Sequence, residues 1–138
     1  MEANELRIGN WFYPCSTIGG ITIPNTEIFW KVGAIDKFGK VSVIEFDQPE
    51  NIYLPINECA KIPLDESWLI RAGAKSVNMG AMLLKFENFD IVFWSDGWVF
   101  ILSKNHEHKI AKFKDMAVHS LQNLIHALTG TELQFAEE

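Results

Sequence analysis

The 138-residue sequence has no apolar run of the about 18 residues that a membrane-spanning helix requires, so we expect no membrane partner. Its first ten positions include an acidic residue and no long apolar run. This pattern argues against a secretory signal and predicts a cytoplasmic protein. The formal net charge of -6 excludes a general positive field that would attract nucleic acid or anionic lipid.

Cysteine is scarce, with Cys15 and Cys59 as the two examples. A small secreted domain held together by disulfides would contain more, so we expect two free thiols in a reducing compartment. The sequence also lacks the glycine-rich motifs of phosphate and dinucleotide binding, the G-x-S-x-G elbow, H-E-x-x-H and C-x-x-C. We therefore predict no cofactor and a protein that is not an enzyme.

The composition is that of a globular protein, with 48% hydrophobic and 22% charged residues. Residues 1–62 contain short apolar stretches separated by glycine and proline, which predict five strands. A bend or bulge is expected at Gly9-Asn10, and a tight turn is expected over residues 36–40 with Gly39 in the left-handed conformation. These features favour a small antiparallel β-barrel of SH3-like type.

Residues 63–138 predict an α+β lobe. Asp65 begins a short helix that Gly73 ends. Strands are expected over residues 77–87, 88–94, 98–103 and 109–113, and Asp96-Gly97 predicts a hairpin turn in which both residues have positive φ. Residues 98–102 are all apolar, which is typical of a central strand covered on both faces.

A second helix is predicted over residues 117–128, with Asp115 as its cap and Gly130 at its end. The expected fold class is therefore α+β, with an N-terminal SH3-like barrel (residues 1–62) packed on a helix-flanked antiparallel sheet (residues 63–138). The two parts form either two lobes or one continuous domain.

The last predicted helix has no charged residue between positions 116 and 131. Opposite its leucine stripe lie four neutral polar side chains: His119, Gln122, Asn123 and His126. A surface helix normally carries Lys and Glu there, so this face is expected to be partly buried. It either forms hydrogen bonds with the neighbouring lobe or recognises a partner protein or second subunit.

A local basic stretch contains Lys104, Lys109, Lys112 and Lys114 with one glutamate. It would suit phosphate contacts, or it forms a solvated edge strand whose lysines prevent aggregation.

His106 and His108 are two residues apart and could bind a metal ion with His119 as a third ligand. The alternative for the pair is an exposed turn. Trp94 and Trp98 flank the predicted hairpin, as a cross-strand core pair or as an exposed ligand-binding pair.

Three segments resemble a family of small uncharacterised bacterial and phage proteins. They are ELRIGNW at residues 5–11, IPL-x-E-x-WL at residues 62–69, and VH-x-LQNL with ALTG-x-EL at residues 118–133. The resemblance implies a protein of phage, prophage, mobile-element or bacterial accessory-gene type. It also marks His119, Gln122 and Asn123 as motif positions.

The sequence thus predicts a non-enzymatic protein-binding or assembly module that recognises a protein partner, or itself, through His119, Gln122, Asn123 and His126. One alternative is a nucleic-acid-associated accessory protein that uses Lys104, Lys109, Lys112 and Lys114. The other is a metal-dependent enzyme that uses His106, His108 and His119.

Overall fold

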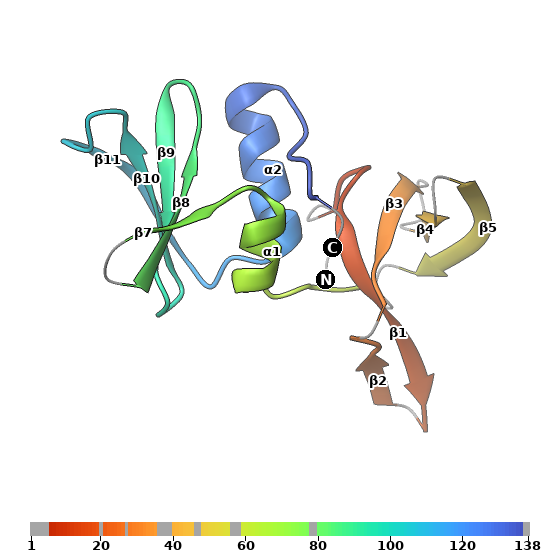
Figure 1. Cartoon of the computed structure of the whole chain (residues 1–138). Helices are drawn as coiled ribbons and strands as arrows, with labels where there is room; N and C mark the ends of the chain where they lie inside the picture. Colours follow the sequence, from red (N-terminus) through yellow and green to blue (C-terminus); the bar gives the residue numbers. More distant parts are fainter. Residues whose placement is uncertain are drawn as a thin grey trace. The chain divides into compact units, whose positions relative to one another are not determined.

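The computed structural model describes residues 6–19, 21–26, 28–35, 40–45, 48–55, 59–77 and 80–136. They form two antiparallel sheets and two helices, so the chain has a mixed α and β fold (Figure 1). The chain divides into two compact units. Unit 1 comprises Met1–Ile62 with Ala117–Glu132, and unit 2 comprises Pro63–Met116 with Leu133–Glu138.

The last helix therefore belongs with the N-terminal strands, whereas the predicted division placed it in the lobe over residues 63–138. The reason is that its neutral face bonds to the segment that precedes the first strand, as described below.

Unit 1 contains a six-stranded sheet. Its strands are β1 (Trp11–Ile18), β2 (Ile21–Pro24), β3 (Trp30–Ile35), β4 (Lys40–Glu45), β5 (Gln48–Pro55) and β6 (Cys59–Ala60). The order is β2-β1-β3-β4-β5, and β6 pairs with β1 off this path. The described strands form no closed barrel, so the SH3-like barrel is not confirmed. The predicted turn around Gly39 lies outside the described residues.

The first strand begins at Trp11, and the bend expected at Gly9-Asn10 lies before it, because residues 7–10 form a turn closed by the Asn10 amide donating to the Arg7 carbonyl at 3.0 Å. Gly9 has a φ of 94°, a conformation that glycine adopts without steric cost. Its amide donates to the Val32 carbonyl (2.8 Å), and the Val32 amide donates to the Asn10 carbonyl (2.9 Å). The turn is thus attached to β3. A core of apolar side chains lies in this unit: Leu6, Phe12, Val32, Val41 and Cys59.

Helix α2 (Val118–Thr129) buries Val118, Leu121 and Ile125. It ends at Gly130, which has a φ of 74°, as the sequence predicted. Its N-cap is Ala117 and no side chain caps it. The prediction of an Asp115 cap was therefore wrong. A helix capped by Asp115 would begin at Met116, whereas α2 begins two residues later, at Val118.

Unit 2 contains a five-stranded sheet whose strands follow one another in sequence order. They are β7 (Lys75–Val77), β8 (Ala81–Lys85), β9 (Phe89–Phe93), β10 (Trp98–Ser103) and β11 (Lys109–Lys114). The predicted strand over residues 77–87 is two strands, because the chain turns through Gly80 (φ 77°). Helix α1 (Glu66–Arg71) is capped as predicted, with the Asp65 carboxylate accepting from the Trp68 amide at 3.1 Å.

The hairpin predicted at Asp96-Gly97 joins β9 and β10. Among the described residues, the positive φ values include that of Gly97 (95°) but not that of Asp96. The Gly97 amide donates to the Trp94 carbonyl (3.0 Å), and the Trp94 amide donates to the Trp98 carbonyl (2.8 Å). The turn is therefore one residue longer than a tight two-residue turn, and needs one left-handed residue instead of two.

Strand β10 alternates in burial, contrary to the expectation that it is covered on both faces. Val99 and Ile101 are buried, whereas Trp98, Phe100 and Leu102 are half-buried. The strand does lie inside the sheet, between β9 and β11. Its unbroken apolar run therefore combines a buried face with an open aromatic one.

Neither Cys15 nor Cys59 forms a disulfide. Neither helix of the described residues has the length and hydropathy needed to cross a membrane.

Candidate functional site

The four helix residues predicted to form a recognition surface do not share one surface. His119 and Gln122 are 2% and 1% exposed, Asn123 is half-buried, and His126 is exposed. A side chain with no accessible area cannot contact a partner without rearrangement of the fold. The predicted surface is therefore corrected at His119 and Gln122.

Gln122 uses both ends of its amide within unit 1. Its Oε1 accepts from the Trp11 amide at 3.0 Å, and its Nε2 donates to the Gly9 carbonyl at 2.9 Å. These bonds attach the side chain to the backbone of the turn and of the first residue of β1. This satisfies the side chain and so offsets most of the cost of burying a primary amide.

Asn123 and Asn10 continue the same network. Asn10 is 0% exposed, and its Oδ1 accepts from the Arg7 amide at 2.7 Å while its Nδ2 donates to Asn123 Oδ1 at 2.9 Å. Asn123 Oδ1 also accepts from Arg7 Nε at 3.1 Å. Arg7 in turn forms an ion pair with Glu132. We call Arg7, Asn10, Gln122, Asn123 and Glu132 the polar clamp.

The polar clamp joins the two end segments that carried the family resemblance. Arg7 and Asn10 lie in the first segment, and Gln122, Asn123 and Glu132 lie in the last. The structure therefore supports the hydrogen-bonding interpretation of the neutral helix face at Gln122 and Asn123. Their clearest role is to attach α2 to the N-terminal turn.

The three histidines proposed as metal ligands lie in two different units. His119 is buried in unit 1, whereas His106 and His108 lie in an exposed segment of unit 2. Within the described ranges, no three His, Cys, Asp or Glu side chains gather where they could hold a metal ion. The signal of two histidines at one spacing was too general to identify a site.

His106 instead takes part in a charge cluster. Its Nε2 lies 2.7 Å from Asp90 Oδ2, and Lys104 Nζ donates to Asp90 Oδ1 at 2.8 Å. Burial alone would raise the pKa of Asp90, but the hydrogen bonds and charges of Lys104 and His106 together hold that pKa below its ordinary value of 3.8. Asp90 is therefore ionised at neutral pH and already neutralised by its neighbours.

Unit 2 has five lysines besides Lys104, and they lie around one face of its five-stranded sheet. Directly paired residues on antiparallel strands point to the same face. One row of such pairs crosses all five strands in the order Lys75, Leu83, Val92, Phe100 and Lys112. Lysine thus occupies each edge strand and apolar side chains occupy the three strands between them.

A second row on the same face repeats this pattern over four strands, in the order Lys85, Asp90, Leu102 and Lys109. Lysine again stands at each end. The acid inside the row is Asp90, whose charge Lys104 and His106 balance. Beside the first row, Trp98 pairs with Lys114. We call the surface formed by the two rows together with Trp98 and Lys114 the lysine-rimmed face.

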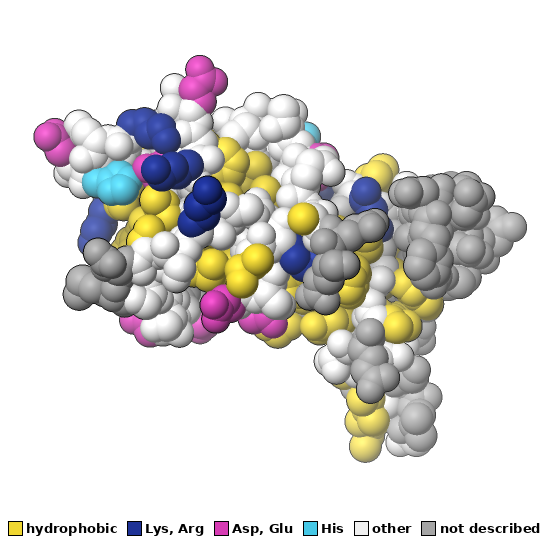
Figure 2. Space-filling model, viewed as in Figure 1, with side chains coloured by type: hydrophobic (Ala, Val, Ile, Leu, Met, Phe, Trp, Pro, Cys, Tyr) yellow, Lys and Arg dark blue, Asp and Glu magenta, His cyan; other side chains and the backbone are white. Residues whose placement is uncertain are grey.

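The opposite face of the same sheet is buried. Its side chains include Met82, Leu84, Ile91, Phe93, Val99 and Ile101, none of which is more than 8% exposed. The two faces of this sheet therefore differ. One is a hydrophobic core, whereas on the other Trp98, Phe100 and Leu102 are half-buried and Asp90 and Val92 are 4% and 8% exposed. Figure 2 shows Lys and Arg side chains spread over this part of unit 2, with apolar side chains between them.

Two aromatic rings form the centre of the open surface. The rings of Trp98 and Phe100 are nearly parallel, at 12° with centroids 6.2 Å apart. Lys109 Nζ lies 4.5 Å from the Phe100 centroid, and Lys112 and Lys114 Nζ lie 5.6 and 5.3 Å from the Trp98 centroid. Such exposed cation–π contacts contribute about 0.5–1 kcal/mol each, so a ligand can displace them.

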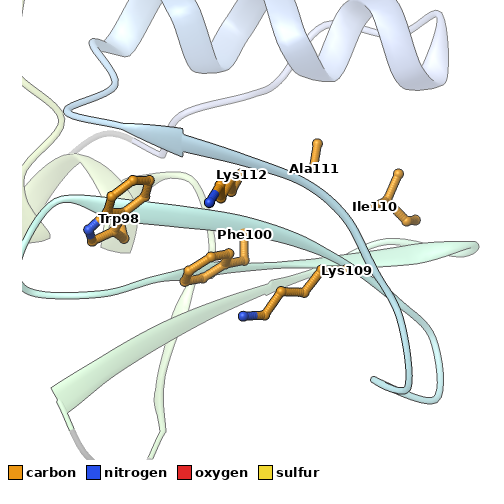
Figure 3. A pocket seen from close by; sticks show the side chains of 6 residues that line it. All are labelled: Trp98, Phe100, Lys109, Ile110, Ala111 and Lys112. Atoms are coloured by element: carbon orange, nitrogen blue, oxygen red, sulfur yellow. The ribbon is translucent and has the colours of Figure 1, made fainter.

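Trp98, Phe100, Lys109 and Lys112 line an open hollow of about 480 Å³ together with Ile110 and Ala111 (Figure 3). The figure shows the Lys109 side chain passing beside the Phe100 ring. A volume of this size lies within the range of small-ligand pockets. The hollow can therefore accept a flat or apolar group whose anionic part faces the lysines.

Sequence reasoning identified Lys104, Lys109, Lys112 and Lys114 but missed the aromatic half of the site. Trp98 and Phe100 were assigned to a strand covered on both faces, and exposed ligand binding was kept as an alternative for Trp98 with Trp94 but not for Phe100. A signal for this face was available in the sequence. Trp98 and Phe100 are two residues apart on one predicted strand, and Lys112 and Lys114 are two residues apart at the end of the next, so each pair points to one face. Lys75 and Lys85 are distant in sequence, and their contribution depends on the order of the strands.

Comparison of the chain with models of protein families, with curated proteins and with solved structures finds no significant match.

Proposed function

We propose that this protein is a non-enzymatic binding module whose lysine-rimmed face holds an anionic ligand. The observation that supports it is the row from Lys75 to Lys112, which places a cation at both edges of the sheet and apolar side chains between them. A half-buried apolar surface with a cationic rim suits a ligand that carries both negative charge and an apolar or flat part.

The charge of the face favours this function despite the net charge of -6. Residues 63–116 contain six lysines, and all of them lie on this face or bond to its one acid, Asp90. Fields of distant carboxylates decay over a Debye length of about 8 Å at physiological ionic strength. Residues 63–116 also contain one arginine and seven acids, so the segment is formally neutral, and the proposal depends on the gathering of its lysines on one face.

The state of Asp90 supports the non-enzymatic part of the proposal. Asp90 is engaged by Lys104 and His106, and the pKa of Asp90 is lowered. A general base near neutral pH would instead require a carboxyl pKa raised towards the working pH. This acid is suited to holding the side chains of Lys104 and His106 in place.

The test is binding of a polyanion, for which heparin is a convenient first probe. Affinity should fall with rising salt, because each lysine contact releases counterions. The double variant Lys109→Gln with Lys112→Gln should bind more weakly by at least tenfold at low salt, measured by calorimetry. Lys40→Gln with Lys61→Gln changes the net charge equally in unit 1 and should bind as the native chain does.

Equal weakening in the two double variants would show that net charge alone controls binding and would contradict the proposed site. Failure of the native chain to bind heparin at low salt would also contradict the proposed site.

Membership in the family of small bacterial and phage proteins is also a proposal. The polar clamp supports it, because it provides a physical reason for the two end segments to occur together in one chain. The clamp residues belong to that shared pattern, whereas the lysine-rimmed face lies between the segments.

A further inference from the structure

We infer that the ligand of the lysine-rimmed face is a single-stranded nucleic acid, with its bases against Trp98 and Phe100 and its phosphates at the lysines. This inference rests on the proposed function and names the class of ligand. It combines two observations, the paired aromatic rings and the lysines that surround them.

The aromatic rings are spaced for successive bases. Trp98 and Phe100 lie two residues apart on one strand, and their rings are nearly parallel at 12°. Both are half-buried, so each ring is anchored by the sheet and still accessible on the open side. Proteins that bind single strands stack bases on such aromatic side chains, which accept any base because every base has a π face.

The lysines are placed for the phosphates. Lys109, Lys112 and Lys114 lie along the neighbouring strand β11, each with its Nζ within 6 Å of one of the two rings. A nucleotide carries a base and a phosphate at a comparable separation. When a base covers a ring, the ammonium group that it displaces meets the phosphate of the same or the next nucleotide.

Two rival ligands fit less well. A nucleic-acid duplex hides the faces of its bases within the stack, so it would use the lysines and leave the rings without a partner. An acidic polypeptide would likewise pair with the lysines, but its carboxylates require no parallel aromatic rings. The combination of ring pair and cationic rim therefore favours the single strand.

The experiment measures fluorescence anisotropy of a labelled oligothymidine of about 10 nucleotides with the full-length chain. The competitors are the matching duplex and polyglutamate. We expect the single strand to bind more tightly than either competitor. Replacing two lysines, as in Lys109→Gln with Lys112→Gln, should reduce the slope of log affinity against log salt by about 1.4.

The decisive variants keep the charge and change a ring. Trp98→Leu and Phe100→Leu should each weaken binding of the single strand by about 5- to 150-fold. Phe100→Tyr retains a ring and should bind like the native chain. Phe89→Leu is the matched control, since Phe89 is a half-buried stacked aromatic on β9 whose alternation places it on the opposite face. Circular dichroism spectra establish that each variant is folded.

The outcomes separate the inference from the function on which it rests. If the leucine variants bind the single strand as tightly as the native chain, while the lysine variants do not, the inference of a single strand stacked on Trp98 and Phe100 fails and the anion-binding module stands. Tighter binding of polyglutamate or of the duplex has the same meaning, and polyglutamate would point to an acidic protein partner. If none of these polyanions binds at low salt, both proposals fail.

Discussion

The polar clamp of unit 1 and the lysine-rimmed face of unit 2 use polar side chains in opposite ways. In the clamp, Gln122 is 1% exposed and both ends of its amide bond to backbone groups. On the open face, Lys75 and Lys112 are exposed at the edges of the sheet. A neutral amide can be buried at low cost once it is bonded, whereas an ammonium group remains in water.

This difference shows how to interpret missing charge in a sequence. In the uncharged helix α2, His126 is exposed, but the polar side chains of the first two turns are buried or half-buried, and Gln122 and Asn123 bond to groups within unit 1. A strand rich in lysine indicates the reverse, and its apolar neighbours then form part of a surface. The uncharged helix suggested a recognition site, but the structure places its Gln122 and Asn123 in a structural contact.

The largest effect is expected at the centre of the clamp. Gln122→Glu removes the donor to the Gly9 carbonyl and places a carboxylate in a buried site. The free energy of unfolding should fall by about 3 kcal/mol or more, measured by urea denaturation.

Gln134→Glu is the matched control, because Gln134 is exposed and the chemical change is the same. If both variants lost the same stability, the clamp would not differ from an ordinary surface and the comparison would fail.

A smaller effect is expected at Asp90, the buried acid of the open face. Asp90→Asn removes charge from the contacts with Lys104 and His106 and should reduce the free energy of unfolding by about 1–3 kcal/mol at neutral pH. Because the folded-state pKa of Asp90 is lowered, its contribution is fully present above the ordinary value of 3.8 and is lost as the pH falls through the lower folded value.

The native chain should therefore lose stability below about pH 4, and Asp90→Asn should lose less over the same range. The measurement is the midpoint of thermal unfolding from pH 7 to pH 2. Glu107→Gln serves as the control, since Glu107 is an exposed acid in the same turn. Parallel acid profiles for the native chain and Asp90→Asn would show that Lys104 and His106 do not stabilise this carboxylate.

The smallest effects on stability are expected when one cation is removed from each region. Arg7→Gln removes the bond to Asn123 and the ion pair with Glu132, and should reduce the free energy of unfolding by about 1–2 kcal/mol. Lys112→Gln removes the same charge from an exposed position and should change it by less than about 0.5 kcal/mol. Urea denaturation measures both. A larger loss in Lys112→Gln than in Arg7→Gln would reverse the comparison.

Local sequence signals predicted local structure well. Asp65 caps α1, Gly130 ends α2, and Asp96-Gly97 marks the hairpin between β9 and β10. Each depends on residues within a few positions of one another, so the backbone conformation follows from the residues themselves. Asp115 failed as a cap because its φ of 52° places it in a left-handed conformation outside the helix.

Predictions that required distant contacts were less successful. The strand containing Trp98 and Phe100 was expected to be covered on both faces, since an apolar run does not reveal how many faces are buried. The neutral face of α2 left two interpretations open, because sequence spacing does not identify the group that a buried amide bonds to. The structure decides that matter for Gln122 and Asn123 through bonds that span more than 100 residues.

The sequence by itself determined the mixed α and β class, the two helices, most strands of the second half, and the positions of the lysines. Helical and strand periodicity and turn chemistry are local properties, so the residues contain them directly. Tertiary structure alone decided that α2 belongs with the N-terminal strands, and that Lys75 and Lys85 join Lys109 and Lys112 around an aromatic centre. The physical reason is that strand pairing, which sets the neighbours of each side chain, depends on contacts between segments that the sequence separates.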